Sequence, residues 1–273
     1  MEQKLVQKSD LKEKMNKKYK IILLLITILL SYLVMFFVFK DRKVYVVKRY
    51  NAETKETTTF EYIIKDNDSI LHGEFVRYNK AGKKIAEGNF ISGTISGKSI
   101  YYFDNGIIKS IFYRKNSEIT EQNIDNFPSG KIMRYTLYDD LGMSAFIIRF
   151  DEKGNVESYK GYPIIETYQY KIKSKERFKI KVNRHPKSGD TLQLQYLIAD
   201  IPNAKRSVKV KNLDVNEAKA KRTIKKTSQI GIDVEEILTK KGINTIRAIV
   251  KYEFNDQKKT VINDTISFKL KVN

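Results

Sequence analysis

Several residue types on which enzyme and metal chemistry depends are missing from this sequence or nearly so. The 273 residues include no cysteine, no tryptophan and only two histidines. Without cysteine, disulfide bonds, thiolate catalysis and thiolate metal sites are excluded. His72 and His185 lie far apart in the sequence, beside Gly73 and Pro186, so both are expected in loops rather than in a catalytic or metal site.

Motifs for phosphate binding and metal binding are missing as well. The sequence contains no GxxxxGK[ST] run and no GxGxxG that opens a helix. The acidic groups at 66–68 and 139–140 lack the long loop and terminal glutamate of a calcium site, so they are expected to be turn residues. An enzyme is therefore the least expected class. No catalytic, cofactor-binding or metal-ligating residue is predicted, and no cofactor.

Negative charge is scarce relative to positive charge. Lysine and arginine number 52 against 32 aspartates and glutamates, for a formal net charge of +20. Such an excess can indicate a nucleic acid or an anionic membrane as partner. However, the chain is rich in Lys, Ile, Asn and Tyr together, which base-composition bias in a genome can produce without a basic ligand. The charge alone therefore assigns no partner.

One long uncharged apolar run is present, at residues 21–39. A helix of this length, at about 1.5 Å per residue, nearly matches a hydrocarbon core about 30 Å thick. A cleaved signal peptide would be shorter and would end on a small-residue site, whereas basic residues follow this run. A single-pass transmembrane helix is therefore expected at 21–39, between a basic tail at 1–20 and a juxtamembrane segment at 40–66. The N-terminus is expected in the cytoplasm and the C-terminal region in the periplasm or another extracytoplasmic space, with the lipid bilayer as the partner of the anchor.

Four glycines recur at a fixed period after this segment. Gly82, Gly106, Gly130 and Gly154 are each 24 residues apart, and an aromatic residue precedes each one across a short polar turn. Glycine supplies the positive φ of a tight reversal, and alternating apolar and polar residues flank the turns. The period predicts a row of antiparallel β-hairpins, in which these glycines build turns rather than ligand sites.

The first hairpin units carry a family resemblance. The residues concerned are Gly73-Glu-Phe-Val-Arg-Tyr78, Gly82-Lys-Lys-Ile85, Glu87-Gly88-Asn-Phe90, Gly93, Gly97 and Tyr102-Phe-Asp-Asn-Gly106. At these positions the chain resembles the MORN-variant repeat family, found in bacterial proteins that are often named YwqK-like antitoxin components. The resemblance covers roughly residues 67–163 and weakens after Arg114, where 116–127 reads as a decayed copy. It implies an elongated, twisted sheet of hairpins that serves as an interaction module.

Residues 164–273 show a longer alternation of apolar and polar residues. Such strands, separated by turn clusters, indicate two sheets packed face to face. An immunoglobulin-like β-sandwich is expected, with one helical turn at Asp233–Leu238. The predicted fold class is therefore mainly β, with one N-terminal transmembrane helix, a MORN-like hairpin repeat sheet and this sandwich. The alternating segments are Tyr168–Ile172, Phe178–Val182, Leu192–Ile198, Ile246–Phe254 and Ile266–Val272.

A basic segment within the expected sandwich is the strongest local anomaly. Asp214 and Glu217 are the only acidic residues that oppose its charge. We interpret it first as a solvated loop and edge strand, where lysine discourages pairing between sheet edges. The alternative is a site for an anion, a lipid headgroup or a nucleic acid, although the aromatic residues that stack on bases are missing. The candidate contact residues are Lys205, Arg206, Lys209, Lys211, Lys219, Lys221, Arg222, Lys225 and Lys226.

The sequence favours a membrane-anchored, non-enzymatic binding or scaffold protein that presents the hairpin sheet and the sandwich to a protein or envelope-polymer partner. Two alternatives stay open. One is an antitoxin-like protein that neutralises a cognate toxin, and the other is a basic domain that binds nucleic acid or anionic lipid through residues 205–226. A protein partner is expected and nucleic acid is not. The sequence does not decide whether the hairpin sheet and the sandwich pack together.

Overall fold

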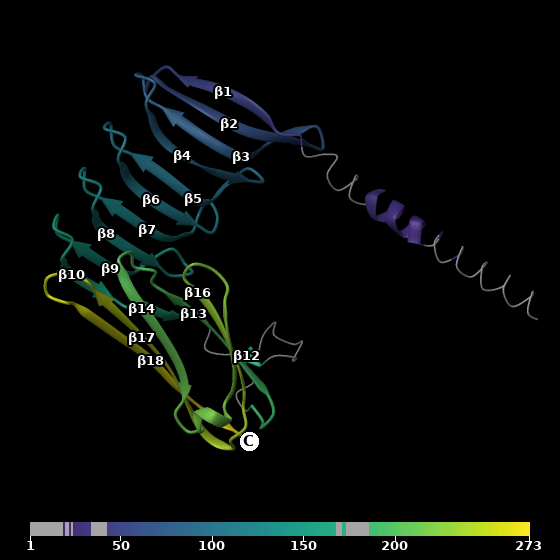
Figure 1. The fold of residues 1–273 in the computed structure, drawn as a ribbon, viewed down its shortest axis with the longest axis vertical. Coiled ribbons are helices and arrows are strands. Elements are labelled where there is room, and N and C mark those ends of the chain that lie inside the picture. Colours follow the sequence, from purple (N-terminus) through teal and green to yellow (C-terminus); the bar gives the residue numbers. More distant parts are fainter. Residues whose placement is uncertain (1–18, 20–21, 23, 34–42, 168–170, 173–185) are drawn as a thin grey trace, which may run out of the picture.

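The computed structural model describes residues 19, 22, 24–33, 43–167, 171–172 and 186–273. A ten-stranded antiparallel sheet, here called the hairpin row, is followed by two smaller sheets (Figure 1). The strands of the hairpin row are β1 (Tyr45–Asn51), β2 (Glu56–Lys65), β3 (Asp68–Tyr78), β4 (Lys84–Ile91), β5 (Thr94–Tyr102), β6 (Ile108–Arg114), β7 (Thr120–Asn126), β8 (Ile132–Tyr138), β9 (Ser144–Phe150) and β10 (Val156–Gly161).

The prediction of a transmembrane helix at 21–39 is wrong. The contiguous described helical residues of the apolar run are 24–33. No helix among the described residues is long and apolar enough to cross a bilayer. Residues 21, 23 and 34–39 of the predicted span, and all of the tail except Tyr19, lie outside the described residues. The single-pass topology and the localisation that depended on this helix are wrong with it, whereas the lipid bilayer as a partner stays a prediction.

The hairpin row pairs its strands in chain order, from β1 to β10. A period of 24 residues equals one pair of strands, so the turns at Gly82, Gly106, Gly130 and Gly154 all fall on the same side of the sheet. Their φ angles are +74°, +83°, +86° and +91°. Each glycine N–H donates to the carbonyl three residues earlier, at 2.9, 2.8, 2.8 and 2.9 Å. A side chain is disfavoured at these φ values, and this is the physical reason for the glycine period.

The hairpin row extends beyond the residues in which the repeat motif can be recognised in the sequence. It begins with β1 and β2, inside the segment 40–66 that was assigned to a juxtamembrane role. The decayed copy at 116–127 contains β7 and pairs normally with β6 and β8. Strand pairing therefore persists where the glycine motif is lost, because the backbone hydrogen bonds of a sheet do not depend on the residues that define the repeat motif.

Aromatic rings pack along one face of the early hairpins. The centroid of Phe75 lies 6.5 Å from that of Phe60 and 5.3 Å from that of Phe90. Gly88 lies beneath Phe75, and a Cβ at this glycine would come within 2.7 Å of the ring. Cross-strand aromatic contacts stabilise a sheet locally, so each hairpin depends on its neighbours.

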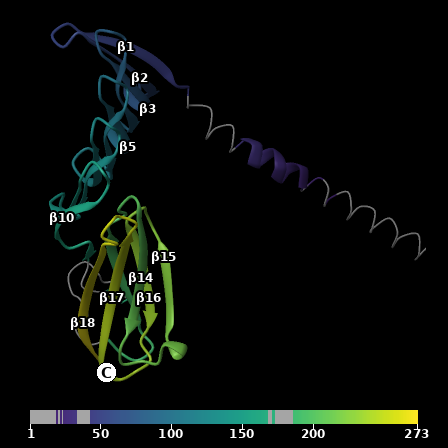
Figure 2. The same cartoon turned by 60° about the vertical axis from the view of Figure 1, so that its left-hand side comes forward.

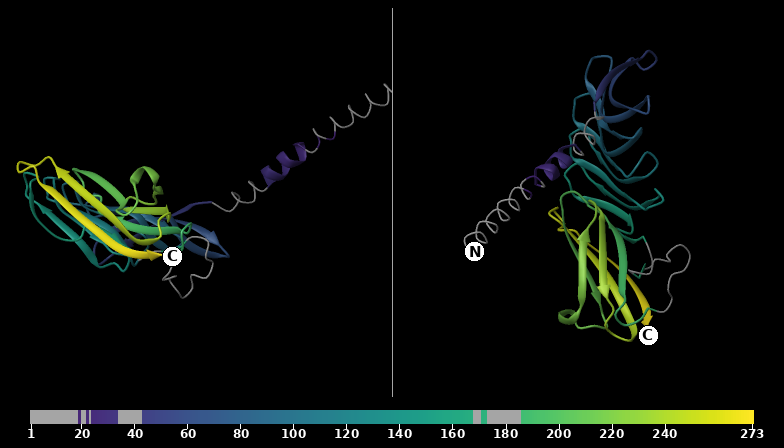
Figure 3. Two further views of the ribbon diagram at one scale, coloured as in Figure 1. Left: turned by 90° about the horizontal axis from the view of Figure 1, so that it is seen from below. Right: turned by 90° about the vertical axis from the view of Figure 1, so that its right-hand side faces the viewer.

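The C-terminal sheets form a two-layer sandwich, and the right-hand view of Figure 3 shows them face to face. One sheet has the order β11-β13-β16-β15, with β12 beside β13, and the other has the order β14-β17-β18. This is the A-B-E-D and C-F-G order of constant-type immunoglobulin domains. The strands are β11 (Ile164–Glu166), β12 (Lys171–Ile172), β13 (Thr191–Ile198), β14 (Ala204–Asn212), β15 (Lys221–Lys226), β16 (Gly231–Ile237), β17 (Gly242–Phe254) and β18 (Val261–Val272).

The helical turn predicted at Asp233–Leu238 is wrong. These residues belong to β16 and its end, and Val234, Glu236 and Leu238 are buried in alternation. A period of two is that of a strand. A short 3₁₀ helix lies instead at Glu217–Lys219 (η1). Two of the alternating segments, Phe178–Val182 and most of Tyr168–Ile172, lie outside the described residues.

The hairpin row and the sandwich share one hydrophobic core. Buried side chains of β8, β9 and β10 join those of both sandwich sheets in a single cluster. In Figure 2 the narrow row is seen to continue directly into the sandwich. The C-terminal end of the row is thus covered, whereas β1 is the outermost strand at the other end. The residues that the row contributes are Tyr135, Leu137, Phe146, Ile148, Phe150 and Val156.

Candidate binding surfaces

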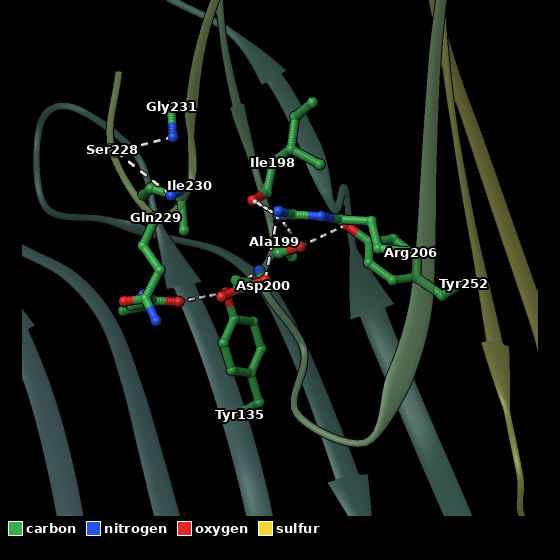
Figure 4. Close-up of polar contacts among 11 residues, drawn as sticks. Tyr135, Ile198, Ala199, Asp200, Arg206, Ser228, Gln229, Ile230, Gly231 and Tyr252 are labelled. Atoms are coloured by element: carbon green, nitrogen blue, oxygen red, sulfur yellow. Dashed lines mark hydrogen bonds and ion pairs between the residues drawn. The ribbon is translucent and has the colours of Figure 1, made fainter. Parts of the chain in front are cut away.

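A hydrogen-bond network at the junction fixes the hairpin row to the sandwich (Figure 4). The buried hydroxyl of Tyr135 on β8 donates to Oε1 of Gln122 at 3.0 Å and accepts from the backbone N–H of Asp200 at 2.9 Å. Nε2 of Gln122 donates to Oε1 of Gln229 at 2.8 Å. Asp200 and Gln229 belong to loops of the sandwich, so two separate loops are held by one strand pair of the row.

A second layer of the same network orders the loop that carries Asp200. The guanidinium of Arg206 donates to the carbonyls of Ile198 and Ala199 at 3.1 and 3.0 Å, and lies 3.4 Å from the Asp200 carboxylate. The hydroxyl of Tyr252 donates to the Ala199 carbonyl at 2.8 Å. Burial raises the pKa of the Tyr252 hydroxyl well above its usual value, so this hydroxyl stays a donor.

The turn between β15 and β16 is ordered by a serine. Oγ of Ser228 accepts from the backbone N–H of Gly231 at 2.8 Å and from that of Ile230 at 3.3 Å (Figure 4). These bonds close the turn and direct the intervening Gln229 toward the hairpin row.

The last hairpin turn forms a further contact with the sandwich. The Asp256 carboxylate accepts from the backbone N–H of Val156 at 3.2 Å, across 100 residues of sequence. The rings of Phe150 and Phe254 lie 6.0 Å apart. The junction therefore combines buried apolar area with hydrogen bonds on two sides, which restrains hinge motion between the two regions.

The predicted basic site divides into two chemically different sets. Arg222 is withdrawn from the surface: its side chain is 7% exposed, and its guanidinium contacts Glu236 at 2.8 Å and Glu217 at 2.7 Å. Arg206 is occupied at the junction. The seven lysines of the set, in contrast, are all exposed: Lys205, Lys209, Lys211, Lys219, Lys221, Lys225 and Lys226.

Six of these lysines lie on β14 and β15, which end their sheets on the same side of the sandwich. We call the seven exposed lysines the lysine edge. Its charge is partly opposed, because Lys225 pairs across the strands with Asp233, and Thr223 with Glu235. The arrangement suits weak contact with a polyanion and also suits protection of an exposed sheet edge.

Four large apolar side chains are exposed at one corner of the junction. Leu141 and Met143, in the turn between β8 and β9, are 75% and 62% exposed, and Tyr159 and Tyr162, on and after β10, are 52% and 71% exposed. The backbone N–H of Tyr162 donates to the carbonyl of Ala145, two residues after Met143, so the β8–β9 turn and the end of β10 lie at the same end of the sheet. We call this set the apolar corner.

The apolar corner was missed at the level of sequence, although a signal existed. The turn Asp139-Asp140-Leu141-Gly142-Met143 has two large apolar residues where polar ones are usual. Gly142 adds a turn with φ +81° that falls outside the glycine period. An apolar residue in a tight turn indicates a contact surface more strongly than one in a strand does. A strand residue can be buried in the core of the protein, whereas a residue at the tip of a turn stays exposed.

The remaining polar candidates behave as structural residues. Nδ1 of His72 lies 3.4 Å from the backbone N–H of Ser92, and His185 lies outside the described residues. The Asp139 carboxylate accepts from the backbone N–H groups of Leu141 and Met143 at 3.0 and 2.8 Å, as in an Asx turn. Within the described part of the chain, no group of three His, Cys, Asp or Glu residues is placed to hold a metal ion.

Comparisons with known proteins do not assign this chain to a family. No family model matches it, and no curated protein matches it. Among solved structures it is similar to the crystal structure of the S-layer protein SbsC domains 4 and 5, at 10% identity and a TM-score of 0.23, over 84% of this chain and 97% of that chain. A TM-score this low supports no inference about fold or function.

Proposed function

We propose that this chain is a non-enzymatic binding protein in which the hairpin row and the sandwich form one rigid support for a protein partner. The apolar corner carries this proposal. Its four large side chains stand exposed beside the buried junction, where the backbone is held by the network around Tyr135. Exposed apolar groups on a rigid backbone lose little conformational entropy on binding, so they favour association with a protein partner.

Site-specific photo-crosslinking in cells tests this role. A photoreactive phenylalanine analogue would replace Leu141, Tyr159 or Tyr162, one at a time, in the full chain. We expect discrete adducts of higher mass from these positions. Leu213, Ile243 and Val261 are matched controls, since they are also exposed apolar residues but lie on the sandwich away from the corner. Absence of adducts at the corner, or adducts from the control positions alone, would contradict the proposal.

The lysine edge supports a second candidate function, contact with an anionic polymer. The observation in its favour is the exposure of all seven lysines together with the withdrawal of both arginines. Lysine contacts with a polyanion weaken steeply as the salt concentration rises. Binding releases counterions condensed on the polyanion, and this release is less favourable at high salt. We expect binding to double-stranded DNA or anionic vesicles to fall when Lys205, Lys209 and Lys211 are changed to Gln. Binding that is indifferent to salt or to these changes would exclude this role.

The antitoxin-like role implied by the repeat resemblance stays a prediction. It requires a cognate toxin, and the same crosslinking experiment would recover one from the apolar corner if it were the partner.

A further inference from the structure

The outer end of the hairpin row contains a cleft with an unusual polar lining. It has a volume of about 570 Å³ and lies over β1, β2 and β3, against the turn between β3 and β4. Three lysines from separate segments line it: Lys48 of β1, Lys55 of the β1–β2 turn and Lys80 of the β3–β4 turn. Among the described residues, no carboxylate lines the cleft.

Strand register places the remaining lining groups on one face. Tyr50 pairs with Thr57, and Thr57 pairs with Tyr78, so these three side chains form a row across β1, β2 and β3. Lys48 pairs with Thr59 in the adjacent row. The cleft thus combines ammonium groups, threonine hydroxyls and two tyrosines on a single surface.

The positive charge in the cleft is not neutralised internally. Lys48, Lys55 and Lys80 form no ion pair within the described part of the chain. The nearest carboxylate on the same face of β2 is Glu61, opposite Val46, and its Oε2 is already engaged by the backbone N–H of Glu74 at 2.7 Å. An anion from outside would therefore meet no carboxylate among the described residues that line the cleft.

The two turns that carry lysines are closed by side-chain hydrogen bonds. Oδ1 of Asn79 accepts from the backbone N–H groups of Ala81 and Lys83, each at 3.0 Å. Oδ1 of Asn51 accepts from Glu53 and Thr54 at 2.9 and 3.1 Å. Lys80 and Lys55 are therefore presented from ordered turns rather than from loose loops, which lowers the entropy lost on binding.

The next hairpin unit shows what fits this position. There the carboxylate of Glu87 accepts a hydrogen bond from the hydroxyl of Tyr102, and it accepts one from Nζ of Lys84 at 2.7 Å. Nζ of Lys84 also lies 5.0 Å from the centroid of the Tyr102 ring. Burial alone would raise the pKa of Glu87, but the hydrogen bonds from Lys84 and Tyr102 lower it below its usual value. The unit thus holds a charged carboxylate beside a tyrosine and an ammonium.

Register identifies the equivalent place in the first unit. Tyr102 and Ile100 lie 24 residues after Tyr78 and Val76. Glu87 pairs with Ile100, and Thr59 pairs with Val76, so Thr59 occupies the position that Glu87 occupies one unit later. The first unit therefore has the tyrosine but lacks the carboxylate. By the same register Glu56 stands where Lys84 stands, so the ammonium groups of the first unit come from other positions, Lys48, Lys55 and Lys80.

We infer that this cleft binds an acidic saccharide, with a sugar carboxylate at the position that Glu87 fills in the next unit. Tyr50 is 65% exposed and lines the cleft, where a sugar ring can stack on its aromatic ring. Thr57 and Thr59 supply hydroxyls for the hydroxyls of a sugar, and the hydroxyl of Thr59 is anchored on the Val76 carbonyl at 3.3 Å. An acidic peptide would instead be expected to pair with the backbone of the outermost strand β1.

This inference deepens the proposed binding role but uses none of the residues of the apolar corner. A failure of saccharide binding would leave the crosslinking result intact, and a failure of crosslinking would leave the cleft intact. The two proposals are therefore tested separately.

Titration calorimetry on the full chain with trigalacturonate, triglutamate and maltotriose tests the inference. We expect trigalacturonate to bind, and neutral maltotriose and the peptide triglutamate to bind at least tenfold more weakly. Replacement of Lys48, Lys55 and Lys80 by Gln should weaken trigalacturonate binding at least tenfold, whereas the matched variant at Lys205, Lys209 and Lys211 should not. Equal binding of triglutamate would overturn the saccharide assignment, and binding that survives the first variant would overturn the site.

A single substitution gives the sharpest test. Thr59→Glu supplies the missing carboxylate from within the chain, as Glu87 does in the next unit. We expect this variant to remain folded, with a melting temperature at or above that of the unaltered protein, and to lose trigalacturonate binding at least tenfold. A folded Thr59→Glu variant that binds trigalacturonate normally would contradict the inference.

Discussion

The hairpin row and the sandwich are both antiparallel β structures, yet they bury their side chains in different ways. Strand β13 of the sandwich buries every second residue between two sheets, whereas no residue of β2 in the hairpin row is fully buried. A single-layer sheet has no partner sheet, so it gains stability from neighbouring hairpins and from whatever covers its ends. The sandwich supplies that cover at β8, β9 and β10. The comparison indicates that the junction stabilises the row more than any turn within it does.

The largest effect is expected at the junction. Tyr135→Ala removes a fully buried ring and its bonds to Gln122 and Asp200, and should lower the free energy of unfolding by about 4 to 5 kcal/mol. Phe112→Ala, a half-buried ring within the row, should cost about half as much. Urea denaturation followed by circular dichroism measures both. Equal losses would mean that the junction has no special role.

A buried ion pair in the sandwich gives the next effect. Arg222→Met leaves the Glu236 carboxylate, whose side chain is 3% exposed, without its guanidinium, and should cost about 3 kcal/mol or more. The double variant Arg222→Met, Glu236→Leu should recover much of this loss. Lys251→Met, which breaks an exposed pair with Glu253, should cost less than about 1 kcal/mol. If the exposed pair proved as costly, the assigned burial would be wrong.

Two glycines of the row, one beside the junction and one in the β5–β6 turn, should differ in the cost of substitution. A Cβ at Gly161, beside the junction, would come within 2.0 Å of the Ala145 carbonyl oxygen at φ +85°, so Gly161→Ala should destabilise by about 2 to 3 kcal/mol. Gly106 has a similar φ of +83° but nothing within 4 Å, so Gly106→Ala should cost about 1 kcal/mol. Melting temperatures of the two variants decide this, and the reverse order would contradict it.

The smallest effects concern pH and have opposite signs in the two regions. Burial raises the pKa of Glu166 on β11 to about 7, so the folded state binds its proton more tightly than the unfolded state. Its contribution to stability is therefore present at low pH and is lost as pH rises through about 7. The pKa of Glu87 is lowered, so its contribution is present above its usual pKa and is lost as pH falls.

Melting curves at pH 5 and pH 8 check these signs. Glu166→Gln should reduce the loss of stability between pH 5 and pH 8, and Glu87→Gln should destabilise the protein at both values. A Glu166→Gln variant with the same pH profile as the unaltered chain would contradict the assignment to this residue.

Local patterns in the sequence predict the local geometry of this molecule well. The glycine period predicts the turns that lie along one side of the hairpin row. It is visible in the sequence because a backbone φ near +80° favours glycine over other residues. The alternation at 192–198, 246–254 and 266–272 gives three strands of the sandwich. The helical turn predicted at 233–238 is wrong because a glutamate occupies a buried position of the strand. The carboxylate of Glu236 forms a buried ion pair with Arg222, so the apolar alternation of the strand is interrupted in the sequence.

Contacts between distant segments are not visible in such patterns. Tyr135 and Asp200 are 65 residues apart, and Val156 and Asp256 are 100 apart. No periodicity connects them, so the junction could not be predicted. The apolar run at 21–39 met every length criterion for a membrane helix, and only the structure corrects it.

Rigid coupling of the two regions is the central claim, and a distance measurement between them tests it most directly. Because the chain has no cysteine, spin labels can be placed uniquely at Lys98→Cys on β5 and Lys209→Cys on β14. A pair at Lys209 and Lys269, both within the sandwich, gives the width expected of a rigid body. Pulsed electron resonance should show one narrow distance distribution for the first pair, as narrow as for the second. A broad or multiple distribution for the first pair alone would show that the row moves on the sandwich, and would contradict the account.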